Sequence, residues 1–277
     1  MAAPSQNKTL YAIFGNPISH SISPIIHNAA LKNAKINGIY AAFKTETAQD
    51  TVKMIKELDI AGASITIPHK TDIIKHIDKI GETAKKIGAV NTVINENGLL
   101  FGTNTDAGGA IKALAEHTEI ENKNIAILGA GGAARAVIYG VNFKKGKVTL
   151  LNRTIDKGEK LAKEFNVNFM PLSEINSEIN KHKFEIIINT TSLGMAGRED
   201  KSPVKKEYLN KDIIVMDIIY NPLKTKLLKY AEEKGCKTIN GISMLVYQAA
   251  LQFELFIGIQ APIDVMKKAA DAASTTL

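Results

Sequence analysis

Short apolar runs rich in isoleucine and valine alternate along the chain with segments whose apolar residues recur at helical spacing. This alternation is typical of an α/β protein with a parallel sheet. In the first part of the chain it predicts strands and helices at Thr9–Phe14, Ser23 onward, Ala48–Leu58, Ala63–Ile67, Val90–Ile94 and Leu99–Gly102. We expect Ser23 to cap its helix and Pro24 to take the first helical position. Glu96-Asn97-Gly98 predicts a hairpin turn between the last two strands.

A second series begins with the apolar strand Asn124–Leu128 and continues to about Gly241. Further strands are predicted at Val148–Leu151, Glu185–Ile188 and Ile213–Met216, and helices at Ala133–Phe143, Asp156–Phe165 and Thr225–Lys234. The tail, Ile242–Ile257, is apolar at helical spacing, and we expect it to pack on the first domain. Since no low-complexity linker interrupts the chain, the pattern predicts two α/β domains joined directly with a cleft between them. One would hold residues 1–106 and 242–277, and the other residues 107–241.

The composition of the 277 residues, 45% hydrophobic and 23% charged, is that of an ordinary globular protein. No apolar stretch is long enough for a membrane span, and the polar segment Met1–Lys8 does not resemble a secretion signal. The single cysteine, Cys236, cannot form an intrachain disulfide, and no Cys/His cluster has zinc spacing. We therefore expect a cytoplasmic protein without a metal.

The formal net charge of +7 raises the question of nucleic-acid binding. The lysines are scattered, however, as at Lys157, Lys160 and Lys163, and no aromatic residues interleave with a basic run. We interpret the charge as solvation with some attraction for anionic small molecules.

The clearest motif is Gly129-Ala130-Gly131-Gly132-Ala133-Ala134, which follows a predicted strand and opens a predicted helix. In this context the motif indicates dinucleotide binding. Gly129 permits the tight turn, Gly131 lets the backbone approach a pyrophosphate, and free N–H groups at the helix start meet its charge. The alternative is a tight turn with no ligand.

The end of the next strand indicates which dinucleotide is bound. An NAD site usually places a carboxylate there for the ribose 2′-hydroxyl, whereas this chain has Asn152-Arg153-Thr154, with Lys157 close behind. Arginine and lysine suit a 2′-phosphate, so NADP is favoured over NAD. The alternative for Arg153 and Lys157 is a solvated helix start.

Uncharged polar residues gather at predicted strand ends in the first domain. They lie in the segments Gly15–Ser21, Thr66–Lys70, Asn91-Thr92 and Asn104–Asp106. One Lys and one Asp among many hydrogen-bonding groups suit a polyhydroxylated ligand whose proton moves when a hydride moves. Each residue also has a simpler interpretation: Ser19 and Ser21 as turn formers, Asp106 as a helix cap, Lys70 as a solvated lysine and His69 as a structural residue.

At these residues the sequence resembles the shikimate dehydrogenase family. The matching blocks run in order along nearly the whole chain: Gly15–Ser21 with Ser23-Pro24, Thr66–Lys70, Gly88–Thr92, Thr103–Gly108, the glycine turn, Asn152–Thr154, Asn189–Met195, Asp217–Pro222, Asn240-Gly241 and Gln248. The resemblance implies an NADP-binding Rossmann-like domain at 107–241, a substrate-binding domain from the rest, and the NADP(H)-linked reduction of 3-dehydroshikimate to shikimate on the path to chorismate and the aromatic amino acids.

The resemblance also implies roles for individual residues. Lys70 would be the acid/base at the C3 oxygen, with Asp106 beside it. The substrate carboxylate would be held by Ser19 and Ser21, and the rest of the substrate by Thr66, Asn91, Asp106, Tyr220 and Gln248. The cofactor would be bound by Gly129, Ala130, Gly131, Gly132, Ala133, Asn152, Arg153, Thr154, Lys157, Ile218 and Gly241.

Some interpretations stay open at this point. Met195 and Met244 suit a pocket wall or the core, and Glu82 lies where some relatives place a residue near the cofactor. Apolar residues near Ile18, Ile22 and the tail suit either the core or a homodimer contact. Quinate/shikimate dehydrogenases, which often use NAD, share most of the blocks. A non-catalytic shikimate- or quinate-sensing regulator on the same fold is the alternative from another class, although Lys70 and Asp106 are both present and no DNA-binding module is evident.

Overall fold

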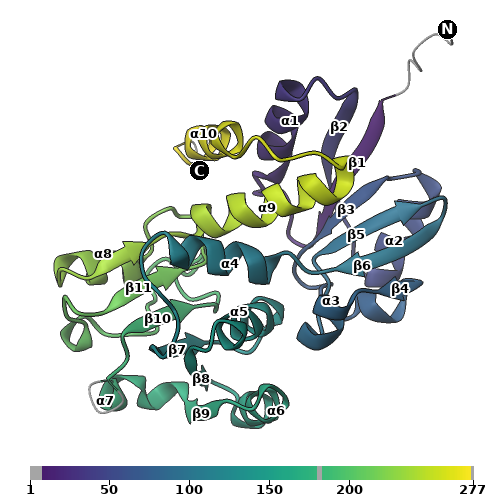
Figure 1. Cartoon of the computed structure of the whole chain (residues 1–277). Helices are drawn as coiled ribbons and strands as arrows, with labels where there is room; N and C mark the ends of the chain where they lie inside the picture. The colour runs from purple at the N-terminus through teal and green to yellow at the C-terminus, as the bar shows by residue number, and fades with distance from the viewer. Residues whose placement is uncertain (1–7, 180–182, 276–277) are drawn as a thin grey trace, which may run out of the picture. The chain divides into compact units, whose positions relative to one another are not determined.

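The structure, a computed structural model, describes residues 8–179 and 183–275 (Figure 1). The chain divides into two compact units. The first holds the described residues up to Thr105 together with those from Gln248 onward, and the second runs from Asp106 to Tyr247. The sequence analysis placed these boundaries after Asp106 and after Gly241. The structure differs in assigning Asp106 and residues 242–247 to the second unit.

The first unit is built on a six-stranded mixed sheet with the order β2-β1-β3-β5-β6-β4. Strands β1, β2 and β3 are parallel, whereas β5 is antiparallel to both β3 and β6. The elements are β1 (Thr9–Gly15), α1 (Ser23–Asn33), β2 (Gly38–Lys44), α2 (Ala48–Glu57), β3 (Gly62–Ile65), η1 (Ile73–Lys75), β4 (Lys79–Ile80), α3 (Glu82–Ile87), β5 (Thr92–Glu96), β6 (Leu99–Thr103) and α10 (Ile263–Ser274).

Local signals set several of these boundaries. The predicted hairpin is confirmed, and both turn residues, Asn97 and Gly98, have positive φ angles, of 54° and 87°. Helix α1 begins at Ser23 with Pro24 in its first turn, but its N-cap is Ile22, so the prediction of Ser23 as the cap was wrong. The Ser23 amide donates to Oγ of Ser21 at 3.3 Å, so a hydroxyl two residues earlier satisfies it and Ser23 joins the helix.

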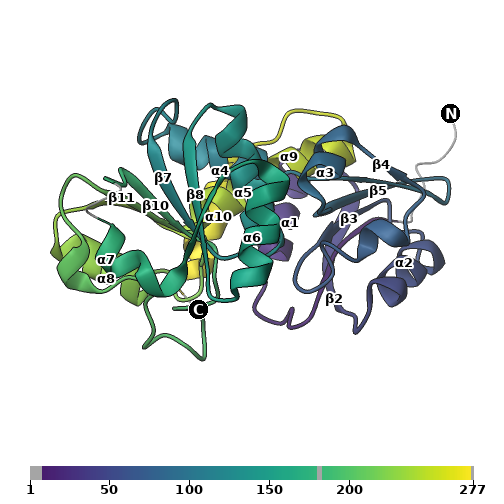
Figure 2. The same ribbon diagram turned by 90° about the horizontal axis from the view of Figure 1, so that it is seen from below.

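The second unit is built on a six-stranded parallel sheet with the order β12-β11-β10-β7-β8-β9, the strand order of a Rossmann fold. Figure 2 shows β11, β10, β7 and β8 in this order. Its elements are α4 (Asp106–Ala115), β7 (Asn124–Leu128), α5 (Gly132–Phe143), β8 (Lys147–Asn152), α6 (Ile155–Phe165), β9 (Asn168–Pro171), η2 (Leu172–Glu174), α7 (Ile175–Glu178), β10 (Ile186–Asn189), η3 (Lys206–Tyr208), β11 (Ile214–Asp217), α8 (Lys226–Glu233) and β12 (Lys237–Ile239).

Both faces of this second sheet are buried. Along β7, Ile125 and Ile127 belong to one apolar cluster, whereas Ala126 and Leu128 belong to another. Successive side chains of a strand point to opposite faces, so helices must cover both sides of the sheet. This is why the strands appear in the sequence as continuous apolar runs.

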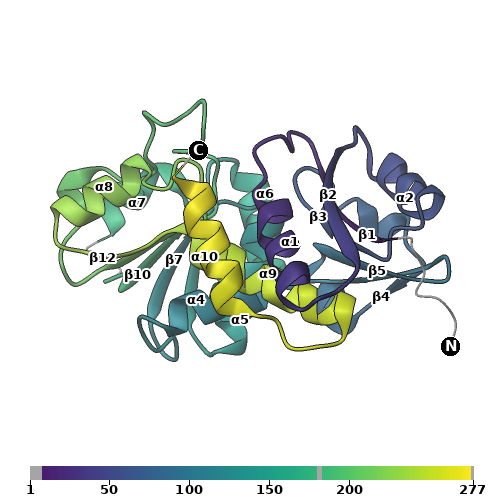
Figure 3. The ribbon, with the colours of Figure 1, turned by 90° about the horizontal axis from the view of Figure 1, so that it is seen from above.

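The predicted apolar tail forms α9 (Gly241–Ile257), which begins in the second unit and ends in the first. Within the first unit, Phe256 of α9 stacks on Tyr11 of β1, and α10 lies along α1 (Figure 3). The expectation that the tail packs on the first domain therefore holds for Gln248–Ile257. No helix in the described part of the chain is both long and apolar enough to cross a membrane.

Candidate functional site

Two loops of the first unit meet at the edge of the sheet where β1 and β3 end. The Asn16 amide donates to the Ile67 carbonyl at 2.9 Å. A Cβ added at Gly15 would lie 2.4 Å from Cγ2 of Thr66, so only glycine allows this approach. The loop that carries Ser19 and Ser21 and the loop that carries Thr66 and Lys70 therefore leave the sheet side by side.

Asn91 joins the same edge because β5 runs antiparallel to β3. The Ile65 amide donates to the Asn91 carbonyl at 2.8 Å, and the side chain of Asn91 is 1% exposed. Its Oδ1 accepts from Thr92 Oγ1 and from the Thr105 amide, both at 2.7 Å. Its Nδ2 donates to Thr105 Oγ1 at 3.0 Å and to Oε1 of Gln248 at 3.3 Å. Asn91 and Gln248, 157 positions apart in the chain, are thus in direct contact.

Lys70 stands on a short segment that is fixed at both sides. Its carbonyl accepts from the Val90 amide at 2.8 Å. The neighbouring His69 is buried, and its Nε2 lies 3.0 Å from the Thr45 carbonyl oxygen. Since a carbonyl can only accept, this nitrogen carries the proton, and His69 is an anchor for the Lys70 segment.

Asp106 is the first residue of α4 and is 4% exposed. It follows Thr105 directly, and the Thr105 amide is the donor to Asn91. We call the edge of the first sheet that carries Ser19, Ser21, Thr66, Lys70 and Asn91 the polar edge. Asp106 therefore directly follows a residue, Thr105, that is bonded to this edge.

In the second unit the glycine turn lies between β7 and α5. Gly129 has φ +108°, and an added Cβ would lie 2.9 Å from Oγ1 of Thr190, so both its conformation and its surroundings demand glycine. Gly131 is different, because a Cβ there would have no protein atom within 4 Å. No side chain caps α5, and no acidic residue lies in its first turn. The open space and the uncapped helix start fit the pyrophosphate of a dinucleotide.

The end of β8 adjoins this turn, since the Gly129 amide donates to the Leu151 carbonyl at 2.7 Å. Nδ2 of Asn152 donates to the Thr154 carbonyl at 2.8 Å, which shapes the loop that presents Arg153. Arg153 and Lys157 are exposed and form no ion pair with any described residue, whereas Arg135 on α5 pairs with Glu164. Two such cations beside a pyrophosphate cradle fit the 2′-phosphate of NADP.

A buried polar cluster that the sequence did not predict lies behind the loop after β11. Asp217, 0% exposed, accepts from Thr225 Oγ1 at 2.7 Å, from Asn189 Nδ2 at 3.1 Å and from the Ile219 amide at 3.1 Å. Burial raises the pKa of Asp217 to about 6, although these donors favour its charged form. The cluster holds the segment that contains Ile218 and Tyr220.

Ile218 and Gly241 are neighbours in the structure. A Cβ added at Gly241 would lie 2.3 Å from the Ile218 carbonyl oxygen, so the start of α9 is pressed against the Ile218-Ile219 backbone. Two residues assigned to the cofactor by resemblance therefore meet at the carboxyl edge of the second sheet.

The three residues left open by the sequence lie in different settings. Met244 is 6% exposed and belongs to the apolar core of the second unit, whereas Met195 is 37% exposed. Glu82 is exposed at the first position of α3, where a carboxylate also favours the helix. Of the two apolar residues considered for a dimer contact, Ile22 is in the core and Ile18 is half-buried.

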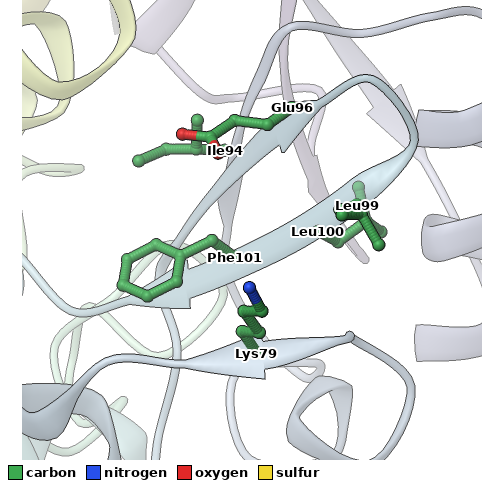
Figure 4. A pocket seen from close by; sticks show the side chains of 6 residues that line it. All are labelled: Lys79, Ile94, Glu96, Leu99, Leu100 and Phe101. Carbon is green, nitrogen blue, oxygen red and sulfur yellow. The ribbon is translucent and has the colours of Figure 1, made fainter.

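A hollow of ≈380 Å³ lies on the hairpin of the first unit, away from the polar edge (Figure 4). Its lining residues are Lys79, Ile94, Glu96, Leu99, Leu100 and Phe101. Glu96 pairs with Leu99 at one end of the hairpin, and Thr92 pairs with Thr103 at the other, next to Asn91. The hollow contains none of the predicted site residues.

Comparison with known proteins gives a consistent result along the chain. Residues 13–93 match the model of the shikimate dehydrogenase substrate binding domain, residues 112–221 that of shikimate / quinate 5-dehydrogenase, and residues 241–270 that of the shikimate 5′-dehydrogenase C-terminal domain.

Among curated proteins, the shikimate dehydrogenase (NADP(+)) of Methanococcus maripaludis is 48% identical over 94% of this chain and 95% of its own length. Two solved structures are also similar over nearly their whole lengths. Shikimate dehydrogenase from Aquifex aeolicus has a TM-score of 0.88 at 39% identity and covers 95% of this chain and 97% of its own. Shikimate 5-dehydrogenase from Thermus thermophilus, solved with NADP(H) and shikimate, has a TM-score of 0.87 at 34% identity. The match covers 96% of this chain and 99% of that chain.

Proposed function

This chain belongs to the shikimate dehydrogenase family, and we propose that it catalyses the reversible, NADP-linked reduction of 3-dehydroshikimate to shikimate. The observation that carries this proposal is the polar edge of the first unit, where Thr66, Lys70 and Asn91 stand on adjoining segments. A single ammonium group among uncharged hydrogen-bonding side chains suits a carbonyl substrate that carries several hydroxyls.

In the proposed reaction Lys70 and Asp106 are the catalytic residues. The hydride for the C3 carbonyl carbon would come from NADPH bound to the second unit. Nζ of Lys70 donates its proton to the C3 oxygen, which turns the carbonyl into a hydroxyl and leaves a neutral amine. In the reverse direction the amine accepts that proton as the hydride leaves. Asp106, a buried carboxylate, would stabilise the protonated form of Lys70.

The remaining polar residues are proposed to bind and orient the substrate. Ser19 and Ser21, on the loop after β1, would donate to the carboxylate. Thr66, Asn91, Asp106 and Gln248 would bind the ring hydroxyls, and Tyr220 would also reach the substrate. The direct contact between Asn91 and Gln248 supports this assignment, because one hydroxyl can meet both amides.

The cofactor is proposed to bind along the carboxyl edge of the second sheet. The backbone from Gly129 to Ala133 would hold the pyrophosphate, and Asn152, Arg153, Thr154 and Lys157 the 2′-phosphate. Ile218 and Gly241 would lie near the nicotinamide. The open space beside Gly131 supports this assignment, as does the exposure of Arg153 and Lys157 without an ion pair to any described residue.

Initial rates of nicotinamide reduction test the proposal, with shikimate and quinate each combined with NADP and NAD. We expect turnover largely confined to shikimate with NADP. Comparable rates with quinate or NAD would place the protein with the dual-specificity dehydrogenases. Stabilisation by shikimate without turnover would favour the sensing regulator instead.

The variant Lys70→Ala tests the catalytic assignment. We expect it to lose at least about 99% of kcat, because general acid–base catalysis contributes roughly 10² to 10⁴ in rate. Its affinity for NADP should stay near the wild-type value. Lys86→Ala, which removes an exposed lysine of α3, is the matched control and should be fully active. Near-normal turnover of Lys70→Ala would contradict the assignment.

Two further parts of the proposal concern the setting of the enzyme. We place the reaction in the cytoplasm, on the ground that the single cysteine, Cys236, cannot form an intrachain disulfide. A homodimer is also proposed, and sedimentation equilibrium of the purified protein distinguishes it from a monomer of 30.0 kDa.

A further inference from the structure

A chain of buried hydrogen bonds leads from Tyr40 of β2 to the proposed substrate residues. Tyr40 donates to Ser64 Oγ at 2.6 Å, and Ser64 donates to Oε1 of Gln252 at 2.8 Å. Nε2 of Gln252 donates to the Asn91 carbonyl at 3.0 Å and to Thr92 Oγ1 at 3.1 Å. All of these residues lie in the first unit, and Gln252 is 1% exposed.

The backbone at one end determines the direction of every bond in this chain. The Asn91 carbonyl can only accept, so the Gln252 atom that faces it must be Nε2. Oε1 then faces Ser64 and can only accept, which leaves Ser64 Oγ to accept from Tyr40. Thr92 Oγ1 accepts from Gln252 and therefore gives its own proton to Asn91 Oδ1, at 2.7 Å.

The orientation of Asn91 follows from the same rule. Its Oδ1 receives the Thr92 hydroxyl and the Thr105 amide, so Nδ2 must point toward Gln248 Oε1. A flipped Asn91 would set its NH2 group against the Thr105 N–H, two donors facing each other. The amide of Gln248 is then held with Oε1 toward Asn91.

We infer that Gln252 is a positioning residue for substrate binding, which holds Asn91 in the one orientation that offers Nδ2 on the side of Gln248. This inference rests on the proposed function, since it assigns the ring hydroxyls to Asn91 and Gln248. A merely structural side chain in this place on α9 would be apolar, because burying an amide costs free energy unless all its hydrogen bonds are made. Gln252 accepts from Ser64 and donates to the Asn91 carbonyl and to Thr92 Oγ1, so both bonds that it donates lead to Asn91.

If Gln252 has this role, the variant Gln252→Glu should make the KM for shikimate depend on pH. A protonated Glu can donate to the Asn91 carbonyl as Gln252 does, whereas a carboxylate cannot. The ionised side chain would instead attract the Thr92 proton away from Asn91 Oδ1. In the wild type the titratable groups beside these bonds are neutral from about pH 6 to about pH 9, because burial raises the pKa of Tyr40 and lowers that of His27, which faces Gln252, to about 3.

The experiment measures KM for shikimate, KM for NADP and kcat from about pH 6 to about pH 9, a range in which a buried Glu can titrate. For Gln252→Glu we expect a shikimate KM within about threefold of wild type at the acid end and at least about tenfold higher at the alkaline end. The NADP KM should not change. Gln252→Met should show a raised shikimate KM at every pH. Gln49→Glu, the same change at an exposed position of α2, is the control and should match wild type.

Two results would overturn the inference. One is a shikimate KM profile of Gln252→Glu that follows wild type. The other is a loss of kcat and of affinity for both ligands in proportion to lost thermal stability, which indicates a structural role alone. If the Gln252 variants fail to fold, Thr92→Val tests the same inference, because it removes the hydroxyl that links Gln252 to Asn91 with little change of shape. A raised KM for shikimate would support the inference, and a wild-type KM would contradict it. Absence of turnover in the wild type would contradict the proposed function instead.

Discussion

At the scale of single residues, the cations of the second unit differ in whether they pair with a carboxylate. Arg135 and Lys123 pair with carboxylates, Glu164 and Glu185. Arg153 has no ion pair with a described residue, although it follows a strand end where a dinucleotide's ribose is usually met. An exposed arginine without an ion pair contributes little to the stability of the fold, so we look for the role of Arg153 in ligand binding.

Replacing Arg153 with Ser is expected to change cofactor preference and little else. A charge-assisted contact to phosphate contributes about 1.5–3 kcal/mol, so KM for NADP should rise about 10- to 100-fold. KM for NAD, which lacks the 2′-phosphate, should change less than about threefold by the same reasoning. Steady-state kinetics with both cofactors measures the two values, and Arg198→Ser, in the loop after β10, is the control. An equal loss with NAD and NADP would contradict the role of Arg153 in phosphate binding.

Asp217 predicts a pH dependence of stability. Its folded pKa, about 6, lies above the ordinary value of 3.8, so between these values the folded chain holds a proton that the unfolded chain has released. The contribution of Asp217 to the free energy of unfolding therefore falls as pH rises from about 4 to about 6. Asp217→Asn should lose this decline, which amounts to at most about 3 kcal/mol.

Urea unfolding at several pH values between about 4 and about 7 measures this effect. Asp212→Asn removes the same charge from an exposed position and should keep the wild-type slope. Parallel slopes for wild type and Asp217→Asn would show that Asp217 is not the group responsible.

At the scale of elements, the two glycine positions that open α5 and α9 serve different ends. The start of α9 is pressed on the chain itself, since a Cβ at Gly241 would meet the Ile218 carbonyl oxygen at 2.3 Å. The start of α5 faces open space at Gly131. Packing therefore requires a glycine at position 241, whereas no contact with the described chain requires one at position 131.

Alanine at position 131 should therefore weaken mainly NADP binding, whereas alanine at position 241 should mainly lower the stability of the fold. Gly131→Ala should lower stability by no more than about 1 kcal/mol, the cost of a poorer N-cap, but should raise KM for NADP at least about tenfold. Gly241→Ala should destabilise the fold by about 2 kcal/mol or more, because a Cβ cannot fit there without backbone movement. Thermal unfolding and cofactor titration of both variants measure these effects. A Gly131→Ala enzyme with normal NADP affinity would contradict the pyrophosphate assignment.

At the scale of the whole molecule, each unit has its own sheet and its own apolar core. Most of the proposed substrate groups lie in the first unit, whereas Asp106, Tyr220 and all of the proposed cofactor groups lie in the second. Each ligand should therefore stabilise the protein when added alone.

Thermal unfolding with NADP or shikimate tests this expectation. At 100 times its Kd each ligand should add about 2.7 kcal/mol of stability and raise the Tm by several degrees. Lys70→Ala should keep the response to NADP in full, since Lys70 lies in the first unit. A Lys70→Ala protein that no longer responds to NADP would indicate a damaged fold, and its lost turnover would then say nothing about catalysis.

Much of this architecture is predictable because its signals are local. The strands of the second sheet are continuous apolar runs, and the strand Asn124–Leu128 was predicted with its observed bounds. Elements with weak local signals were missed. The edge strand β2 buries few of its residues, and α4 carries two adjacent glycines, which lower helix propensity. The short strands β4, β9 and β12, the helices α3 and α7, and the C-terminal helix α10 were also not predicted.

The fold class, the glycine turn, the lack of an acidic residue at Leu151–Thr154 and the polar segments that carry Ser19, Thr66, Lys70 and Asp106 follow from the sequence. Each of these is a residue type at a fixed place relative to one strand or helix. Only the tertiary structure decided which of them share an edge and what holds them in place. The bond between Ser64 and Gln252 joins residues 188 positions apart, and no local pattern can record it. The spacing of Gln248 and Gln252, one helical turn apart on an apolar helix, was the one hint in the chain.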